Sequence, residues 1–327
     1  MGDGSSLGSP HIIDHEAALG MIDSDEEADE TDHEEEAYET DHEEAADGLR
    51  YPASLTKMMT LYVAFEAVQN GELSMDTKIT VSRKAAAEPP SKLGLRAGQK
   101  IALKYLVRAA AIKSGNDAAT AIAEGISGSE AAFARRMNRT AKSLGMTRTT
   151  FRNAHGLTQN GHLSTARDMT VLGRALFYHY PQYYNIFKRR TTDAGVREVS
   201  NTNRRLLNAY RGADGIKTGY TRAAGFNLVA SAERNGERII ATVFGGRSTA
   251  TRNVRVAELL DLGFKRAPRR VATAAPSRPG YAGNAGANPP GKVVRLSGAV
   301  KKSLHPQLRP GARPAPELLL AMQEGIA

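Results

Sequence analysis

The chain lacks cysteine, and its 327 residues contain no apolar run long enough to cross a bilayer. The absence of cysteine excludes a disulfide framework, a thiolate metal site and a cysteine nucleophile. A transmembrane helix needs roughly 20 predominantly apolar residues, so the sequence predicts no membrane span. The first ten residues also lack the basic start and apolar run of a secretory signal, and we expect no signal peptide in the sequence as written.

Basic residues are absent from the first 49 positions, which hold 18 of the 35 Asp and Glu residues. From Arg50 onward, 44 basic residues therefore face the remaining 17 acidic ones, a net charge of +27. Such an excess suits a nucleic acid, an anionic polymer or a membrane surface. Aromatic residues make up only 6% of the chain and no nucleic-acid-binding motif is recognisable, so we expect no nucleic-acid partner.

Both ends of the chain are predicted to lack a packed core. Residues 1–45 form an acidic arm with few large apolar side chains, so burial cannot offset the entropy lost on ordering, and we expect disorder. The arm repeats Thr-Asp-His-Glu-Glu, but we interpret these groups as solvated charge and expect no metal site. Residues 267–327 contain nine of the 14 prolines, which predicts an extended, Pro-rich basic tail.

Residues 46–266 have the periodicities of a globular domain. Apolar residues at three- and four-residue spacings predict helices over 54–70, 103–112, 117–125, 129–144 and 165–178. Two β-rich runs, 226–232 and 238–244, are joined by a segment containing Asn235-Gly236, which predicts a hairpin. Helices followed by an antiparallel hairpin favour an α+β fold.

A serine and a lysine at helical spacing are the first candidate catalytic pair. Ser54 and Lys57 lie three residues apart at the start of a predicted helix, so their side chains share one face. The amine can then deprotonate the hydroxyl, provided that burial or a second cation lowers its pKa from about 10.4. The alternative is an N-capping serine beside a surface lysine.

Two further motifs are ambiguous when taken singly. Ser114-Gly115-Asn116 is typical of a turn between helices in which Gly115 permits the bend, although it also places a hydroxyl and an amide at the edge of a cleft. Lys217-Thr218-Gly219 is predicted to lie in a strand, where a lysine often only discourages aggregation. A glycine inside a strand, however, marks the close approach of another backbone or a ligand.

The order of the three motifs is more informative than any one of them. S-x-x-K at Ser54, S-x-N at Ser114 and K-T-G at Lys217 follow the order found in penicillin-binding proteins and serine β-lactamases. Five segments extend the resemblance, namely Arg50–Thr60, Ile112–Ala118, Asn153–Leu157, Asp214–Thr221 and Phe226–Ser231. Over residues 46–266 the chain resembles the low-molecular-weight penicillin-binding proteins that are serine-type D-alanyl-D-alanine carboxypeptidases.

This resemblance implies a β-lactamase/transpeptidase-like fold, with an antiparallel sheet packed against helices and a helical subdomain, and no cofactor. It implies that Ser54 attacks the peptide bond between two terminal D-alanines and that penicillins acylate the same serine. The implied catalytic residues are Ser54, the base Lys57, the proton relay Ser114, and Asn116, which holds Lys57 or the substrate backbone. The implied substrate-binding residues are Lys217 and Thr218, which receive the carboxylate, then Gly219 and Tyr220, whose backbone N–H completes an oxyanion site with that of Ser54.

Other activities of the same superfamily are less favoured. A class A β-lactamase needs a glutamate to activate the deacylating water. The glutamates between the second and third motifs, none in the Glu-x-x-x-Asn context of those enzymes, are Glu124, Glu130 and Glu198. We therefore expect no fast β-lactamase, whereas a D,D-endopeptidase stays open. Residues expected to be structural or on the surface are His155, Arg204, Arg205 and Arg247.

The N-terminal stretch departs from the family pattern. Family members have a secretory signal and two strands ahead of the nucleophile helix, where this chain has the acidic arm. We expect a frameshifted or misassigned start, or a truncated gene, and an apolar sheet edge at 238–244. Two readings follow: an active periplasmic enzyme that trims peptidoglycan stem peptides, or a non-catalytic remnant that keeps penicillin binding.

Overall fold

The computed structural model describes residues 46–267 and 275–284. The predicted acidic arm, 1–45, and most of the predicted Pro-rich tail lie outside the described residues. Within the described part, no helix combines the length and the apolar character that a membrane span requires. The domain boundaries at 46 and 266 stay predictions.

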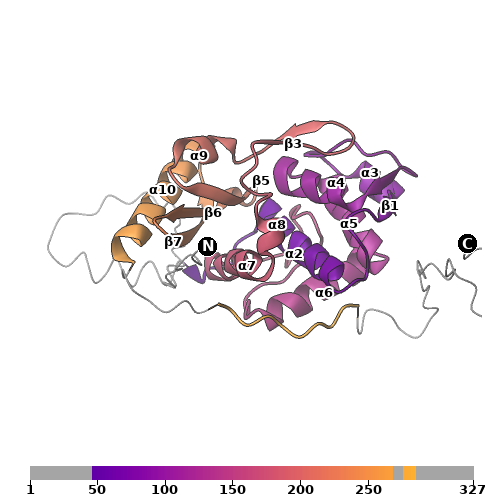
Figure 1. The fold of residues 1–327 in the computed structure, drawn as a ribbon, viewed down its shortest axis with the longest axis horizontal. Helices are drawn as coiled ribbons and strands as arrows, with labels where there is room; N and C mark the ends of the chain where they lie inside the picture. The colour runs from indigo at the N-terminus through magenta and orange to yellow at the C-terminus, as the bar shows by residue number, and fades with distance from the viewer. Residues whose placement is uncertain (1–45, 268–274, 285–327) are drawn as a thin grey trace, which may run out of the picture. The chain divides into compact units, whose positions relative to one another are not determined.

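The described chain alternates helices with short strands before it reaches one longer sheet (Figure 1). The helical elements are η1 (Ala53–Leu55), α2 (Thr56–Gln69), α3 (Arg83–Ala87), α4 (Leu103–Arg108), η2 (Ala109–Lys113), α5 (Asn116–Ser127), α6 (Glu130–Ser143), α7 (Ala166–His179), α8 (Pro181–Tyr184), α9 (Arg204–Ala209) and α10 (Thr249–Arg266). The strands are β1 (Lys78–Thr80), β2 (Lys100–Ala102), β3 (Thr191–Asp193), β4 (Glu198–Ser200), β5 (Ala213–Thr221), β6 (Gly225–Arg234) and β7 (Glu237–Gly246). The two-stranded sheets β1-β2 and β3-β4 accompany the helices, whereas β5, β6 and β7 form one antiparallel sheet.

The β5-β6-β7 sheet is buried on both faces because helices pack on each of them, and alternate residues of a strand contribute to opposite faces. On one face, Leu228 and Ala230 of β6 pack with Leu260 of α10. On the other, Val229 joins the core of the helical side, where α7 packs on the sheet. Among the described strands β5 and β7 each pair only with β6, so β7 is one of the two edges of this sheet.

Helix α2 is the centre of the helical side, with α5, α6 and α7 packed around it. Every residue from Thr56 to Phe65 is buried, so the apolar positions that predicted the helix mark only part of its packed surface. Lys57 lies within this stretch and is 0% exposed. The alternative of a surface lysine is therefore wrong, because no side of this part of α2 faces water.

The structure contains every helix that the apolar spacing predicted, together with the predicted hairpin. Asn235 and Gly236 take φ angles of 54° and 82° in the turn between β6 and β7, as an Asn-Gly hairpin requires. The predicted α+β class is confirmed. Helix α10 was not predicted, although Val256, Leu260 and Gly263 repeat at helical spacing and pack on the sheet.

A short part of the predicted tail packs against the helices. His179 Nε2 of α7 donates to the Pro276 carbonyl at 3.1 Å, and Arg139 Nη2 of α6 donates to the Gly283 carbonyl at 2.9 Å. Asn284 Nδ2 donates to the last turn of α5, at the Ile126 carbonyl. Residues 275–284 therefore contact three helices of the domain that precedes them.

Candidate active site

Ser54 and Lys57 lie where the 3-10 turn η1 continues into helix α2. Ala53, just before the serine, has a φ angle of 48°, a left-handed conformation that is uncommon for a residue with a side chain. Lys57 Nζ lies 2.9 Å from Ser54 Oγ, about one helical turn away. The local fold thus brings together the two side chains that the S-x-x-K spacing predicted to meet.

Two further oxygen atoms hold the amine of Lys57. Its Nζ lies 2.6 Å from the His155 carbonyl oxygen and 2.7 Å from Asn116 Oδ1. The amide of Asn116 is oriented because its Nδ2 donates to the Pro89 carbonyl at 2.8 Å, which leaves Oδ1 as the acceptor. Since both partners only accept hydrogen bonds, a neutral amine gives them its two N–H groups and keeps its lone pair for the Ser54 hydroxyl.

The surroundings of Lys57 favour that neutral amine. Burial lowers the pKa of Lys57 well below its ordinary value of 10.5, and the nearby charge of Lys217 lowers it further. The carboxylates of Asp117 and Glu88 act in the opposite direction but do not prevail. An uncharged amine aimed at a hydroxyl is the state in which lysine can act as a base.

Ser114 and Lys217 form a second serine–lysine pair. Lys217 Nζ donates to Ser114 Oγ at 2.9 Å and to the Thr218 carbonyl at 2.9 Å. Burial, followed by the charge of Arg252, lowers the pKa of Lys217 to about 7. The predicted bend at Gly115 is wrong in detail: Ser114 itself takes the left-handed conformation, with φ 65° and ψ 35°, and so turns its hydroxyl toward the strand.

Two glycines allow other backbone segments to contact the turn that carries Ser54. A β carbon at Gly219 of β5 would lie 3.0 Å from the Pro52 carbonyl oxygen and 3.1 Å from the Ser54 nitrogen. A β carbon at Gly156 would lie 1.7 Å from the Ala53 carbonyl oxygen. The close approach that the K-T-G glycine predicted is present, and β5 and the 153–157 loop both pack closely against the turn that carries Ser54.

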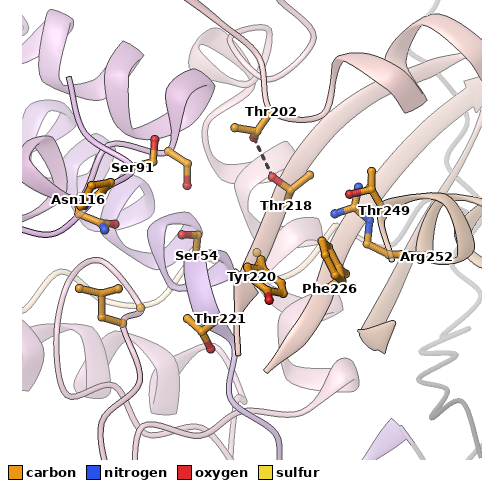
Figure 2. Close-up of a pocket in the computed structure, with 15 residues that line it drawn as sticks. Ser54, Ser91, Asn116, Thr202, Thr218, Tyr220, Thr221, Phe226, Thr249 and Arg252 are labelled. Carbon is orange, nitrogen blue, oxygen red and sulfur yellow. Dashed lines mark hydrogen bonds between the residues drawn. The ribbon is translucent and has the colours of Figure 1, made fainter. Parts of the chain in front are cut away.

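The site opens into a cleft of about 350 Å³. Figure 2 shows Ser54 between Asn116 and Ser91 on the helical side and Thr218 and Tyr220 on the strand side. The lining residues are Ser54, Pro90, Ser91, Ser114, Asn116, Gly156, Leu157, Thr202, Thr218, Gly219, Tyr220, Thr221, Phe226, Thr249 and Arg252. Neither Lys57 nor Lys217 lines the cleft, because each lies behind the serine that it contacts.

Arg252 is a cleft residue that the sequence patterns missed. It lies in the first turns of α10, is only 4% exposed, and donates to the Asn227 carbonyl and to Asn253 Oδ1. Burial lowers its pKa to about 10, so it is still a cation at neutral pH. No short motif marks Arg252; recognising the apolar spacing of α10 was the signal that could have placed it near the sheet.

The other candidate residues do not line the cleft. Arg204 and Arg205 begin α9 with exposed side chains, Arg247 is also exposed, and none of the three lines the cleft. His155 reaches Lys57 through its carbonyl, while its ring lies near two buried glutamates, Glu88 and Glu130. Potential ligand atoms of these three residues lie within 4.8 Å of one another, which is close enough for a metal ion to be considered.

In this site a buried lysine amine contacts a serine at the start of a helix, and a K-T-G strand lies across the cleft. These features define the class of active-serine, penicillin-binding folds. The sequence profile of the D-alanyl-D-alanine carboxypeptidase family matches residues 40–248. The D-alanyl-D-alanine carboxypeptidase DacF of Bacillus subtilis is 41% identical over 218 residues, covering 65% of this chain and 56% of DacF. The chain belongs to the D-alanyl-D-alanine carboxypeptidase family.

Solved structures agree on the fold. Penicillin binding protein 5 from Haemophilus influenzae matches with a TM-score of 0.65 and 35% identity, covering 67% of this chain and 65% of that one. Penicillin-Binding Protein D2 from Listeria monocytogenes, in its ampicillin-bound form, matches with a TM-score of 0.59 and 33% identity over 67% of this chain and 89% of that one. The predicted β-lactamase/transpeptidase-like fold is confirmed, and the chain spans little more than half the length of DacF.

Proposed function

We propose that this protein is a serine D-alanyl-D-alanine carboxypeptidase that removes the terminal D-alanine from peptidoglycan stem peptides. The observation that carries the proposal is the contact between Lys57 Nζ and Ser54 Oγ at 2.9 Å, with the other two amine contacts made to acceptor oxygens. This arrangement supplies a base with its lone pair directed at the nucleophile before any substrate arrives. The family and the penicillin-binding neighbours support the same chemistry.

Acylation then proceeds through the two serine–lysine pairs. Lys57 takes the proton of Ser54 as the Oγ attacks the carbonyl carbon between the two D-alanines. The negative oxygen of the tetrahedral intermediate is stabilised by the backbone N–H groups of Ser54 and Tyr220, and such donors are typically worth about 3–4 kcal/mol each. When the C–N bond breaks, Ser114, backed by Lys217, passes a proton to the departing amine of D-alanine.

The strand side binds the free carboxylate of the substrate. Thr218 lines the cleft directly, and Lys217 lies behind it with a charge that attracts an anion. We add Arg252 to this group, because it lines the same cleft and is a cation. Water finally hydrolyses the ester on Ser54, and penicillins acylate the same hydroxyl.

The location follows from the substrate. A stem peptide belongs to the cell wall, so we propose that the enzyme acts in the periplasm. The net charge of +27 from Arg50 onward suits an anionic wall polymer and does not require a nucleic acid.

The test is acylation by a fluorescent penicillin, combined with D-alanine release from a peptide ending in D-Ala-D-Ala. We expect the wild type to be labelled at one site and to release D-alanine, and Ser54→Ala to do neither. Ser91→Ala is the matched control: Ser91 lines the same cleft, but its hydroxyl donates to the Lys113 carbonyl at 3.0 Å and is predicted to be dispensable for labelling.

The alternatives give different results in the same assays. A folded wild type that is never labelled would contradict the proposal. Labelling without D-alanine release would favour the non-catalytic remnant, and cleavage of cross-linked peptides in preference to the D-Ala-D-Ala terminus would favour a D,D-endopeptidase. Rapid loss of the penicillin label would indicate a β-lactamase.

A further inference from the structure

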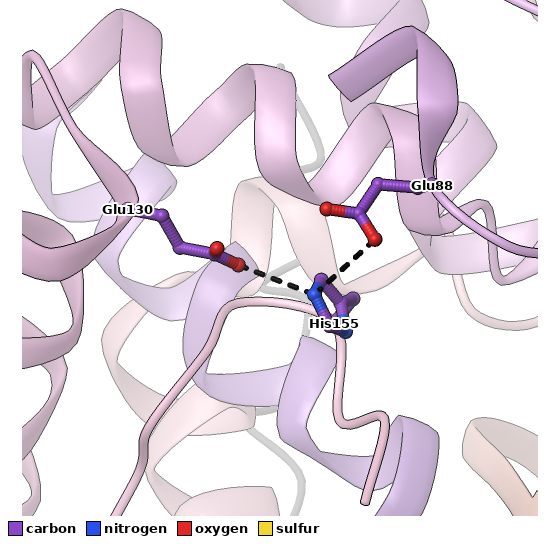
Figure 3. A group of neighbouring side chains, drawn as sticks. All are labelled: Glu88, Glu130 and His155. Carbon is purple, nitrogen blue, oxygen red and sulfur yellow. Dashed lines mark ion pairs between the residues drawn. The ribbon is translucent and has the colours of Figure 1, made fainter. Parts of the chain in front are cut away.

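Glu88, Glu130 and His155 form a buried cluster, and His155 lies in the loop that contacts Lys57; Figure 3 shows its ring between the two carboxylates. His155 Nε2 lies 3.3 Å from Glu130 Oε1 and 3.5 Å from Glu88 Oε2. Each of the three residues is at most 7% exposed. Because two carboxylates are costly to bury, a cluster of this kind requires partners that repay the lost solvation.

Hydrogen bonds fix which nitrogen of His155 carries the proton. The backbone N–H of Leu157 donates to His155 Nδ1 at 3.1 Å, so Nδ1 accepts and the proton of the neutral ring is on Nε2. Burial lowers the pKa of His155 to about 4, which keeps the ring neutral at pH 7. The Nε2–H group therefore faces the oxygens of Glu130 and Glu88 as a donor.

This tautomer argues against a metal site. A metal on Nε2 would need that nitrogen deprotonated, while Nδ1 is already occupied as an acceptor from Leu157. Glu130 Oε2 is also paired with Lys84 Nζ at 2.5 Å, and Glu88 Oε1 accepts from Thr120 Oγ1 at 2.9 Å. The cluster is already satisfied by protein groups.

The same cluster fixes the backbone of the 153–157 loop. Glu130 Oε1 accepts from the Ala154 N–H at 3.0 Å, and the Ala154 carbonyl accepts from Thr60 Oγ1 of α2 at 2.6 Å. One residue on, the His155 carbonyl accepts from Lys57 Nζ at 2.6 Å. The loop is therefore held between a glutamate on α6 and the helix that carries the base.

We propose that Glu130 and Glu88, acting through the ring of His155, hold the His155 carbonyl against Lys57 Nζ and so position the base. His155 is a positioning residue in this scheme, since its ring does not touch the reacting atoms. If the carbonyl moves, one N–H of Lys57 loses its acceptor and can turn toward Ser54, so that the lone pair no longer receives the serine proton. The inference rests on the proposed acylation of Ser54.

Stopped-flow acylation by a fluorescent penicillin separates positioning from binding. The acylation rate constant reports the base, and the dissociation constant of the noncovalent complex reports carboxylate binding. For His155→Leu we expect the rate constant to fall on the order of 10²-fold, the loss typical of a misplaced catalytic group, with the dissociation constant unchanged. His155→Gln, which keeps an N–H donor, should recover part of the rate.

The matched control is His179→Leu, together with His179→Gln. His179 is also a buried histidine bound at both ring nitrogens, but its partners are the Tyr62 hydroxyl and the Pro276 carbonyl. These variants should lower the melting temperature without changing the rate constant of the folded protein. Glu130→Gln is a second variant that should lower the acylation rate constant. Its amide oxygen can still accept from Ala154, but the negative charge facing His155 is lost.

Three results would overturn the inference. The first is an unchanged rate constant in the folded fraction of His155→Leu or, if that variant does not fold, of Glu130→Gln. The second is a change confined to the dissociation constant. The third is stoichiometric binding of Zn²⁺ by the wild type that disappears in His155→Gln. Failure of the wild type itself to be acylated would instead count against the proposed function, because every rate here is a ratio to the wild type.

Discussion

The helical side and the sheet side of the cleft each place one buried lysine against a serine hydroxyl, yet the two lysines are held differently. Lys57 donates to two fixed acceptors, the Asn116 amide and the His155 carbonyl, and approaches Ser54 with its remaining position. Lys217 donates to Ser114 and to the carbonyl of its own neighbour Thr218. The first environment orients a lone pair, whereas the second only anchors an amine.

The charges around the two lysines differ as well. Lys57 has the carboxylates of Asp117 and Glu88 nearby, but burial and Lys217 still lower its pKa. After burial, Lys217 is influenced mainly by a cation, Arg252. An anion entering the cleft would thus meet positive potential on the sheet side and a neutral base on the helical side. The same pairing of residue types can serve two functions because the neighbours differ.

Removing the amine of Lys57, the proposed base on the helical side, should have the largest effect. Lys57→Met keeps the length of the side chain in a fully buried position but deletes the amine. Since general-base catalysis contributes about 10²–10⁴-fold, we expect acylation by penicillin to slow by that factor. Thermal unfolding should show a folded protein, because methionine suits a buried site. Acylation near the wild-type rate in Lys57→Met would assign the base to another group.

Adding a methyl group at Gly219, where strand β5 contacts the turn that carries Ser54, should have the next largest effect. In Gly219→Ala the new methyl group would lie 3.0 Å from the Pro52 carbonyl oxygen and 3.1 Å from the Ser54 nitrogen, so the strand must move away from the nucleophile. Contacts of this length require a shift of a few tenths of an ångström, and because a displacement of about 1 Å can cost on the order of 10²-fold in rate, we expect a loss of up to that size. Gly280→Ala is the control, since no atom lies within 4 Å of its new methyl group. Equal acylation rates for both variants would show that strand β5 need not approach the Ser54 turn.

The motif residues could be located from sequence because their order along the chain is distinctive. Their spacing also predicted the contact between Ser54 and Lys57, which depends only on local helix geometry. Whether each lysine lies behind its serine could not be predicted, because that depends on how α5 and β5 pack against α2. The left-handed conformation of Ser114 could not be predicted either, because glycine is the residue expected in that conformation.

Arg252 and the Glu88–His155–Glu130 cluster show the limit of reading motifs. Arg252 follows Lys217 by 35 positions and reaches the cleft only because α10 returns over the β5-β6-β7 sheet. The cluster joins residues from three separate segments, and only the segment that contains His155 was recognised from the sequence. Such sites arise from tertiary packing, which a single sequence does not specify residue by residue.

Neutralising Arg252 should weaken the anion-binding character of the sheet side. A hydrogen bond to a charged group is worth about 1.5–3 kcal/mol, so Arg252→Gln should raise the dissociation constant of the noncovalent penicillin complex by about 10- to 150-fold. The acylation rate constant at saturation should change much less. Arg255→Gln on the same helix is the control, because Arg255 pairs with Glu258 at 2.7 Å and does not line the cleft. An effect confined to the acylation rate constant would mean that Arg252 supports the chemistry of the helical side and not the binding of the carboxylate.

The smallest expected effect is the pH dependence that Lys217 gives to anion binding. The pKa of Lys217 is lowered to about 7, so its charge is present below that pH and is lost as the pH rises through it. Because Lys217 acts on a bound carboxylate from behind Ser114 and Thr218, we expect the dissociation constant to rise only a few-fold above about pH 7, on the scale of a partly screened charge pair.

Arg252→Gln sharpens this test, because the charge of Arg252 is one cause of the lowered pKa of Lys217. Without that cation, Lys217 should hold its proton to a higher pH, and the rise in the dissociation constant should move in the same direction. The acylation rate constant serves as the internal contrast: because the lowered pKa of Lys57 favours its neutral amine, the rate constant should not fall as the pH rises. A dissociation constant that is flat across neutral pH in the wild type would mean that Lys217 carries no charge relevant to binding, and the sheet side would then rely on Arg252 and Thr218 alone.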